Sequence, residues 1–70
     1  MNKQILYRYQ DGPNESPNGF LLVTPIEQGT MRNFFRCQVV AVLKATGRVA
    51  EVGSIIETDG SKLELYWRED

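Results

Sequence analysis

The sequence has no histidine and only one cysteine, Cys37, and these absences exclude several kinds of chemistry. A single cysteine forms no disulfide within the chain, and without histidine the common zinc sites lack ligands. The base that most often activates a cysteine nucleophile is also missing. We therefore expect no catalytic residue, no cofactor-binding residue and no metal site, and we expect that the protein is not an enzyme.

Long apolar runs and an excess of positive charge are missing as well. Eight Lys and Arg stand against nine Asp and Glu, a net charge of -1, whereas general nucleic-acid binders are strongly basic. No segment approaches the roughly 20 apolar residues of a membrane-spanning helix. The first residues lack the apolar core of a signal peptide, and an unpaired cysteine suits a reducing compartment. These features predict a cytoplasmic protein that does not bind membranes.

The apolar residues that are present follow the patterns of β-strands. A chain of 70 residues is expected to form one domain, residues 1–70. Alternating or continuous apolar segments, separated by Gly, Pro, Asn and Ser, predict an all-β fold. A loop is expected at 11–19 and one helical turn at 25–28. We predict about five antiparallel strands, at residues 4–9, 20–24, 34–45, 48–58 and 61–68.

Two candidate two-residue turns, Thr46-Gly47 and Asp59-Gly60, set the register of the C-terminal half. They join the last three strands into a C-terminal three-stranded meander. The pairs that follow include Cys37 with Ile56, Arg36 with Glu57, Leu43 with Ala50, Ala41 with Val52, Ile56 with Leu63, and Val52 with Trp67. Gly53 is expected in the middle of a strand, with a bulge or a turn as the alternatives.

This register collects apolar residues on one face, which we predict to be the core. Its members are Phe35, Cys37, Val39, Ala41, Leu43, Ala50, Val52, Ser54, Ile56, Leu63, Leu65 and Trp67. Long strands of this kind suggest a small, partly open barrel, similar in general manner to Src-homology-3-like or oligonucleotide-binding (OB-like) folds. Such a resemblance of fold implies no function.

The opposite face carries an apolar strip between charged rows, predicted to consist of Phe34, Val40, Val42, Ile55 and Tyr66. Solvent-facing sheets are usually more polar, so either the N-terminal strands cover this strip or it is an interface. We interpret the protein as a non-enzymatic protein-binding module, a small regulator, inhibitor or adaptor, which uses this face and its acidic loops. The partner is an unidentified protein or a second copy in a homodimer.

The alternative function is binding of single-stranded nucleic acid by a small β-barrel. Aromatic rings stack on bases and cations follow phosphates, and Tyr7, Arg8, Tyr9 and Phe34 are the candidates for those contacts. The predicted register places carboxylates beside Arg36, Lys62 and Arg68, which leaves little positive potential. A nucleic-acid partner is therefore the less favoured interpretation.

Overall fold

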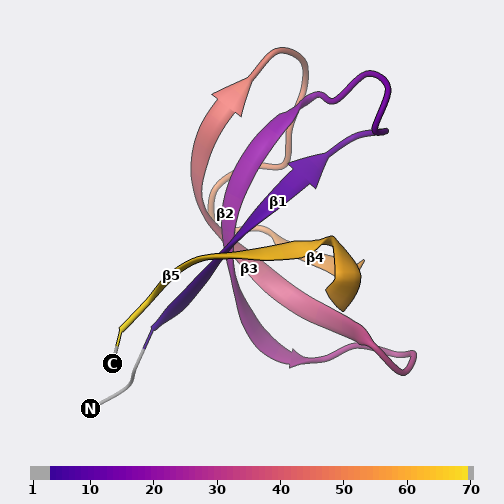
Figure 1. Cartoon of the computed structure of the whole chain (residues 1–70), viewed down its shortest axis with the longest axis vertical. Helices are drawn as coiled ribbons and strands as arrows, with labels where there is room; N and C mark the ends of the chain where they lie inside the picture. Colours follow the sequence, from indigo (N-terminus) through magenta and orange to yellow (C-terminus); the bar gives the residue numbers. More distant parts are fainter. Residues whose placement is uncertain (1–3, 70) are drawn as a thin grey trace.

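The computed structural model describes residues 4–69, which form one antiparallel sheet of five strands in the order β4-β3-β2-β1-β5 (Figure 1). The sheet is strongly twisted and curls into a partly open barrel, so the predicted all-β class is confirmed. Within the described residues, β4 and β5 are the two edges of the sheet. The elements are β1 (Ile5–Asp11), β2 (Gly19–Gln28), β3 (Phe34–Ala45), β4 (Ile55–Asp59), the 3-10 turn η1 (Gly60–Lys62) and β5 (Leu63–Arg68).

The chain turns away from β4 at Asp59, so the predicted C-terminal meander is wrong. The Asp59 side chain accepts a hydrogen bond from the Ser61 amide at 2.9 Å and caps η1, which replaces the expected two-residue hairpin. After η1, β5 crosses to the far side of the sheet and pairs with β1, with Leu63 opposite Tyr9. The predicted pairs Ile56–Leu63 and Val52–Trp67 are therefore not formed, and Trp67 lies opposite Leu6 instead. The meander lies earlier in the chain and consists of β1, β2, β3 and β4.

The predicted register between β3 and β4 is confirmed. Cys37 lies opposite Ile56, and Arg36 lies opposite Glu57. The connection between these strands is longer than expected, because the Thr46 amide donates to the carbonyl oxygen of Asn18 at 2.8 Å instead of closing a hairpin. Residues 46–54 form a loop that folds over the end of the barrel. The Leu43–Ala50 and Ala41–Val52 pairs are consequently absent from the described sheet.

Gly53 lies in a turn, and this shortens β4. The Ser54 amide donates to the Glu51 carbonyl oxygen at 3.1 Å, and Gly53 has a φ of 95°. Positive φ at the third position of a β-turn is the conformation that glycine adopts without strain. The predicted strand 48–58 therefore begins only at Ile55.

The predicted helical turn at 25–28 is wrong, because β2 continues through Pro25 to Gln28. Pro25 pairs with Cys37 of β3, whereas the pairing of β2 with β1 reaches only as far as Tyr7 and Val23. At Pro25, β2 therefore has a neighbouring strand on one side alone. Proline is tolerated at such edge-like positions since it lacks a backbone donor.

The core is built around β2 and β3. Leu21, Leu22 and Val23 are buried in succession, so this continuous apolar run is covered on both sides. Cys37 and Val39 are buried as predicted. The residues that pack around the buried cluster are Tyr7, Tyr9, Val49, Ala50, Ile56 and Leu63.

Several residues of the predicted core face are exposed instead. Leu43 and Val52 are exposed because the loop 46–54 leaves the sheet. Phe35 lies at the open end of the barrel and is partly exposed. Leu65 and Trp67 are exposed because β5 pairs with β1 and forms an edge.

Candidate functional site

Strand β5 carries three consecutive large apolar residues on an edge of the sheet. Leu65, Tyr66 and Trp67 are 54%, 55% and 46% exposed. β5 pairs with β1 along one side, and it is the last strand of the described sheet on the other. Exposed apolar edge strands are the places where β-proteins pair with further chains. We call these three residues the β5 apolar row.

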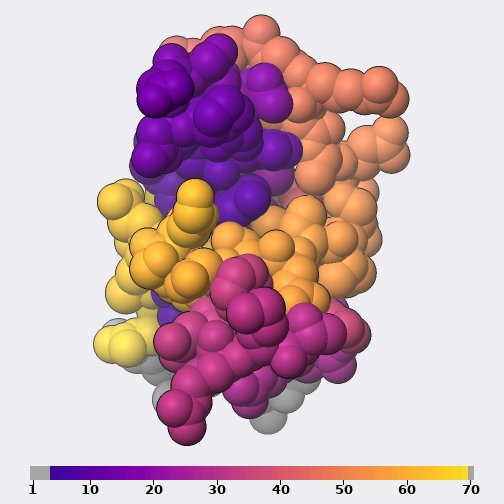
Figure 2. Space-filling model, turned by 90° about the vertical axis from the view of Figure 1, so that its right-hand side faces the viewer, coloured from indigo at the N-terminus to yellow at the C-terminus, as the bar shows by residue number. Residues whose placement is uncertain are grey.

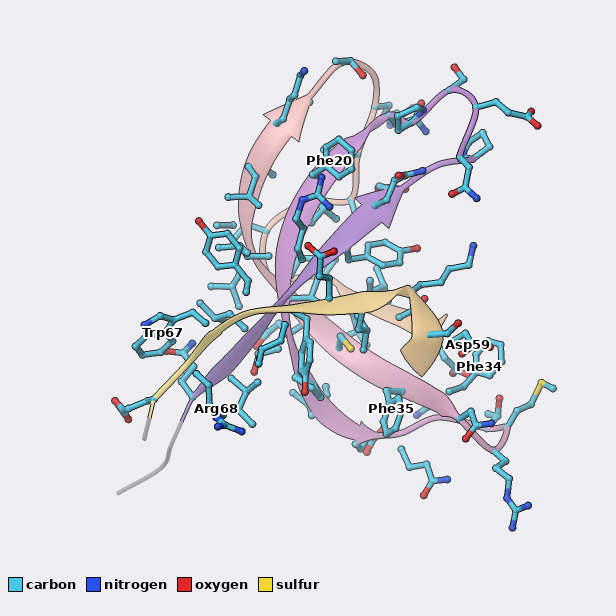
Figure 3. The ribbon with its side chains drawn as sticks, in the orientation of Figure 1. Phe20, Phe34, Phe35, Asp59, Trp67 and Arg68 are labelled. Carbon is cyan, nitrogen blue, oxygen red and sulfur yellow. The ribbon has the colours of Figure 1, made fainter. Side chains whose placement is uncertain are left out.

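A β-bulge determines how the β5 apolar row is presented. Leu65 lies opposite Tyr7, which packs against the core, whereas Trp67 lies opposite Leu6, the residue before Tyr7 in β1. The register shifts between these pairs, so Tyr66 is the extra residue of the bulge. Leu65 therefore belongs to the inner face and Trp67 to the outer face. Figure 3 shows Trp67 projecting away from the sheet.

A small apolar pocket lies beside Leu63, at the start of β5. Its volume is about 150 Å³, and it is lined by Tyr7, Pro25, Phe35, Gly60 and Leu63. The wall between η1 and β3 is tight, since a Cβ atom at Gly60 would lie 2.9 Å from the Phe35 ring. The pocket is smaller than the roughly 300–1,000 Å³ of most small-molecule sites. It suits a single apolar side chain.

The residues predicted to form one apolar strip are spread over the molecule. Phe34 lies opposite Asp59 and Ile55 lies opposite Gln38, both on the β3–β4 side. Tyr66 lies on β5, at the opposite edge of the sheet. Figure 3 shows the same separation, with Phe34 and Asp59 together on one side and Trp67 on the other.

The other two members of the predicted strip lie in the distorted part of β3. The β2–β3 register shifts between Leu22 and Val23, and Val40 is the half-buried extra residue there. This bulge changes which face later residues share, so Val42 lies opposite buried Leu21 rather than beside Phe34. The predicted strip is thus not one continuous surface. Of its members, Tyr66 alone belongs to the β5 apolar row.

The four candidate nucleic-acid contacts are also separated. Tyr7 and Tyr9 pack against the buried core, and Arg8 points to the outer face between them. The Arg8 guanidinium lies 4.1 Å from the centre of the Phe20 ring and 3.8 Å from Glu64. Phe34 is on the β3–β4 side. These residues do not share one face of the sheet.

Arg36 is held in a network of carboxylates at the end of the β2–β3 hairpin. It donates to Glu27 at 2.8 Å and to Glu57 at 3.3 Å. Glu57 also accepts hydrogen bonds from the Thr30 hydroxyl and amide, at 2.8 and 3.2 Å. The Thr30 hydrogen bonds and then Arg36 hold the pKa of Glu57 below its usual value. The network fastens the hairpin to β4.

In contrast to Glu57, the side chains of Cys37 and Tyr9 have raised pKa values. Burial raises the pKa of the Cys37 thiol, so the thiolate that acts as a nucleophile is disfavoured. Burial, followed by the negative charge of Asp11, raises the pKa of the Tyr9 hydroxyl. Both groups lie in or against the core. Their environment is that of structural residues.

Residues 4–69 contain no group of three or more Cys, Asp and Glu side chains placed to hold a metal ion. The described part of the chain also contains no helix that is long and apolar enough to cross a membrane. No protein-family model, no curated protein and no solved structure matches this sequence or fold.

Proposed function

We propose that the chain is a non-enzymatic protein-binding module, a small regulator, inhibitor or adaptor, that binds its partner through the β5 apolar row. The observation that carries the proposal is the exposure of Leu65, Tyr66 and Trp67 on an edge strand. Covering such side chains stabilises a complex by about 25 cal/mol per Å² of apolar area, before the costs of association. Tyrosine and tryptophan commonly dominate the energetics of interfaces.

The geometry of β5 favours addition of an extended segment of the partner to the sheet. In this mode, backbone hydrogen bonds supply affinity and pockets for alternate side chains supply specificity. β5 is an edge strand of the sheet that residues 4–69 form, and the pocket lined by Tyr7, Phe35 and Leu63 is open for one apolar side chain. The partner in this proposal is a different protein with an accessible strand, and a second copy of the chain is the competing occupant.

The double substitution Tyr66→Ser with Trp67→Ser tests the proposal. Because both side chains are about half exposed, the variant is expected to stay folded by circular dichroism. Affinity for a partner isolated from the native lysate should fall by at least about ten-fold, the effect of roughly 1.4 kcal/mol. Sedimentation of the isolated chain shows whether the row instead joins two copies.

A matched control is the double substitution Ile26→Ser with Met31→Ser. These apolar side chains are equally exposed, but they lie at the end of β2 and in the β2–β3 turn. The control should bind the partner as well as the unmodified chain does. If both variants lose the same affinity for the partner, or if only the control loses affinity, the binding surface lies elsewhere.

A further inference from the structure

A second and larger hollow lies on the outer side of β1 and β5. It has a volume of about 320 Å³ and lies between the loop that follows β1 and the start of β5. Figure 2 shows these two segments side by side, in indigo and yellow-orange. We call this hollow the polar groove. The side chains that give it its chemistry are Arg8, Gln10, Asn14, Ser61, Lys62 and Glu64.

The polar groove is rich in hydrogen-bond donors and carries a positive charge. Arg8 and Lys62 are its cations, and Glu64 is its one carboxylate among the described lining residues. Ser61 contributes a hydroxyl and Asn14 an amide. Two cations against one carboxylate leave a net positive charge, which suits an anionic group of a ligand.

Several of these groups are held in place before a ligand arrives. The Arg8 guanidinium is stacked 4.1 Å from the Phe20 ring, which fixes its position in the groove. Its contact with Glu64, at 3.8 Å, is long, and the Glu64 side chain is 75% exposed. Exposed ion pairs of this kind contribute little free energy, so a ligand carboxylate competes readily for Arg8. Gln10 donates to the Pro13 carbonyl and to Asn14 at 3.2 Å each, which holds the loop wall.

We propose that the polar groove receives an acidic side chain from the partner segment that adds to β5. This inference rests on the proposed function, because it specifies the chemistry of the same partner. Leu63 lines both the apolar pocket and the polar groove, so the two hollows flank the start of β5. Successive side chains of an extended segment point to opposite faces of a sheet. A segment along β5 therefore directs an apolar residue to the pocket and a neighbouring acidic residue to the groove.

Single-stranded nucleic acid fits the groove less well than an acidic peptide. One face of the Phe20 ring is covered by Arg8, and the described lining of the groove contains no aromatic ring for a base to stack on. The chain as a whole has a net charge of -1. Nucleic-acid grooves combine stacking rings with a track of several cations. The peptide carboxylate is the ligand that this chemistry favours.

The test uses a capped pentapeptide of alternating glutamate and leucine, titrated into the nitrogen-15-labelled chain and followed by amide chemical shifts. We expect shifts at the amides of Gly12, Asn14 and residues 60–64. Replacing the glutamates of the peptide by glutamines should weaken binding roughly ten-fold, the contribution of one charge-assisted hydrogen bond. The substitution Lys62→Glu should weaken binding of the glutamate peptide by about the same factor. Arg32→Glu makes the same kind of charge reversal in the turn between β2 and β3, and should leave the affinity within about two-fold.

Three results would overturn the inference. The first is no binding, or shifts elsewhere on the chain. The second is equal affinity for the glutamate and glutamine peptides, or for the Lys62→Glu and Arg32→Glu variants. The third is tighter binding of a single-stranded oligothymidylate at the groove, which would assign it to nucleic acid. Capture of the partner by the Tyr66→Ser, Trp67→Ser variant is measured separately. If the partner still requires the β5 apolar row but the peptide does not bind in the polar groove, this inference is wrong and the proposed function stands.

Discussion

Trp67 of β5 lies opposite Leu6 of β1 on the outer face of the sheet, where 46% of its surface is exposed. Two residues earlier, Leu65 lies opposite Tyr7 on the inner face. The two residues would share a face in a regular strand, and the bulge at Tyr66 separates them. One extra residue thus presents apolar side chains on both faces of an edge strand.

Burial predicts that two leucines contribute very differently to the stability of the fold. Leu21 is fully buried between β1 and β3, so Leu21→Ala should lower the free energy of unfolding by about 2–5 kcal/mol. The same change at half-exposed Leu65 should cost less than about 1.5 kcal/mol. Urea unfolding followed by circular dichroism measures both. If the two variants lose a similar free energy of unfolding, β5 is part of the core.

Close approach of two strands predicts that Gly19→Ala is destabilising. A Cβ atom at Gly19 would clash with the Lys44 carbonyl oxygen, so the backbone has to move. Overpacking of this kind costs about 1–3 kcal/mol. Gly47→Ala is the control, because its nearest neighbour is a side-chain atom of Asn18 at 3.0 Å. The melting temperature should fall clearly more for Gly19→Ala, and a smaller fall than in the control would refute this close approach.

The hydrogen bonds to Glu57 predict a contribution to stability that depends on pH. Since folding lowers the pKa of this carboxyl, its contribution is present above the ordinary value of 4.5 and is lost as the pH falls through the lowered pKa. Glu57→Gln should therefore reduce the melting temperature at pH 7 and have little effect in strong acid. Glu15→Gln, in the loop before β2, is the matched control for the change of charge. If the melting temperature of Glu57→Gln is lowered by the same amount at pH 7 and in strong acid, the charge of the Glu57 carboxylate is not the source of the stability.

Burial predicts that the Cys37 thiol reacts slowly in the folded chain. Its pKa is raised by burial, so the reactive thiolate is scarce at pH 8, and the sulfur is enclosed by the core. An aromatic disulfide reagent should modify it rapidly in urea and far more slowly in buffer. Equal rates in the two conditions would mean that Cys37 is accessible.

The register between β3 and β4 could be predicted from sequence because local alternation determines it. Cys37 and Val39 point inward, Arg36 has a carboxylate partner, and these requirements align β3 with β4 even though the connecting loop is not a hairpin. The continuous run Leu21–Val23 was equally informative, since it has no polar residue to point outward. Both features depend on side chains that are close in the sequence or directly opposed.

The position of β5 could not be predicted in the same way. Asp-Gly favours a hairpin, but here the Asp59 side chain bonds to the Ser61 amide and starts a 3-10 turn instead. The pairing of β5 with β1 joins the two ends of the chain, and no local pattern specifies such a contact. Tyr66 is exposed as predicted, whereas Leu65 and Trp67 are exposed because β5 pairs with β1 at the edge of the sheet and not with β4.

The most direct test of β5 as the binding edge is amide hydrogen exchange in the free chain and in its complex with the isolated partner. If an extended segment adds to β5, the amides within residues 63–67 that point away from β1 become hydrogen-bonded and should exchange at least about ten-fold more slowly. The amides of β4, Ile55–Asp59, at the other edge of the sheet, should be unchanged. Slower exchange along β4 with β5 unaffected would contradict the proposed binding surface.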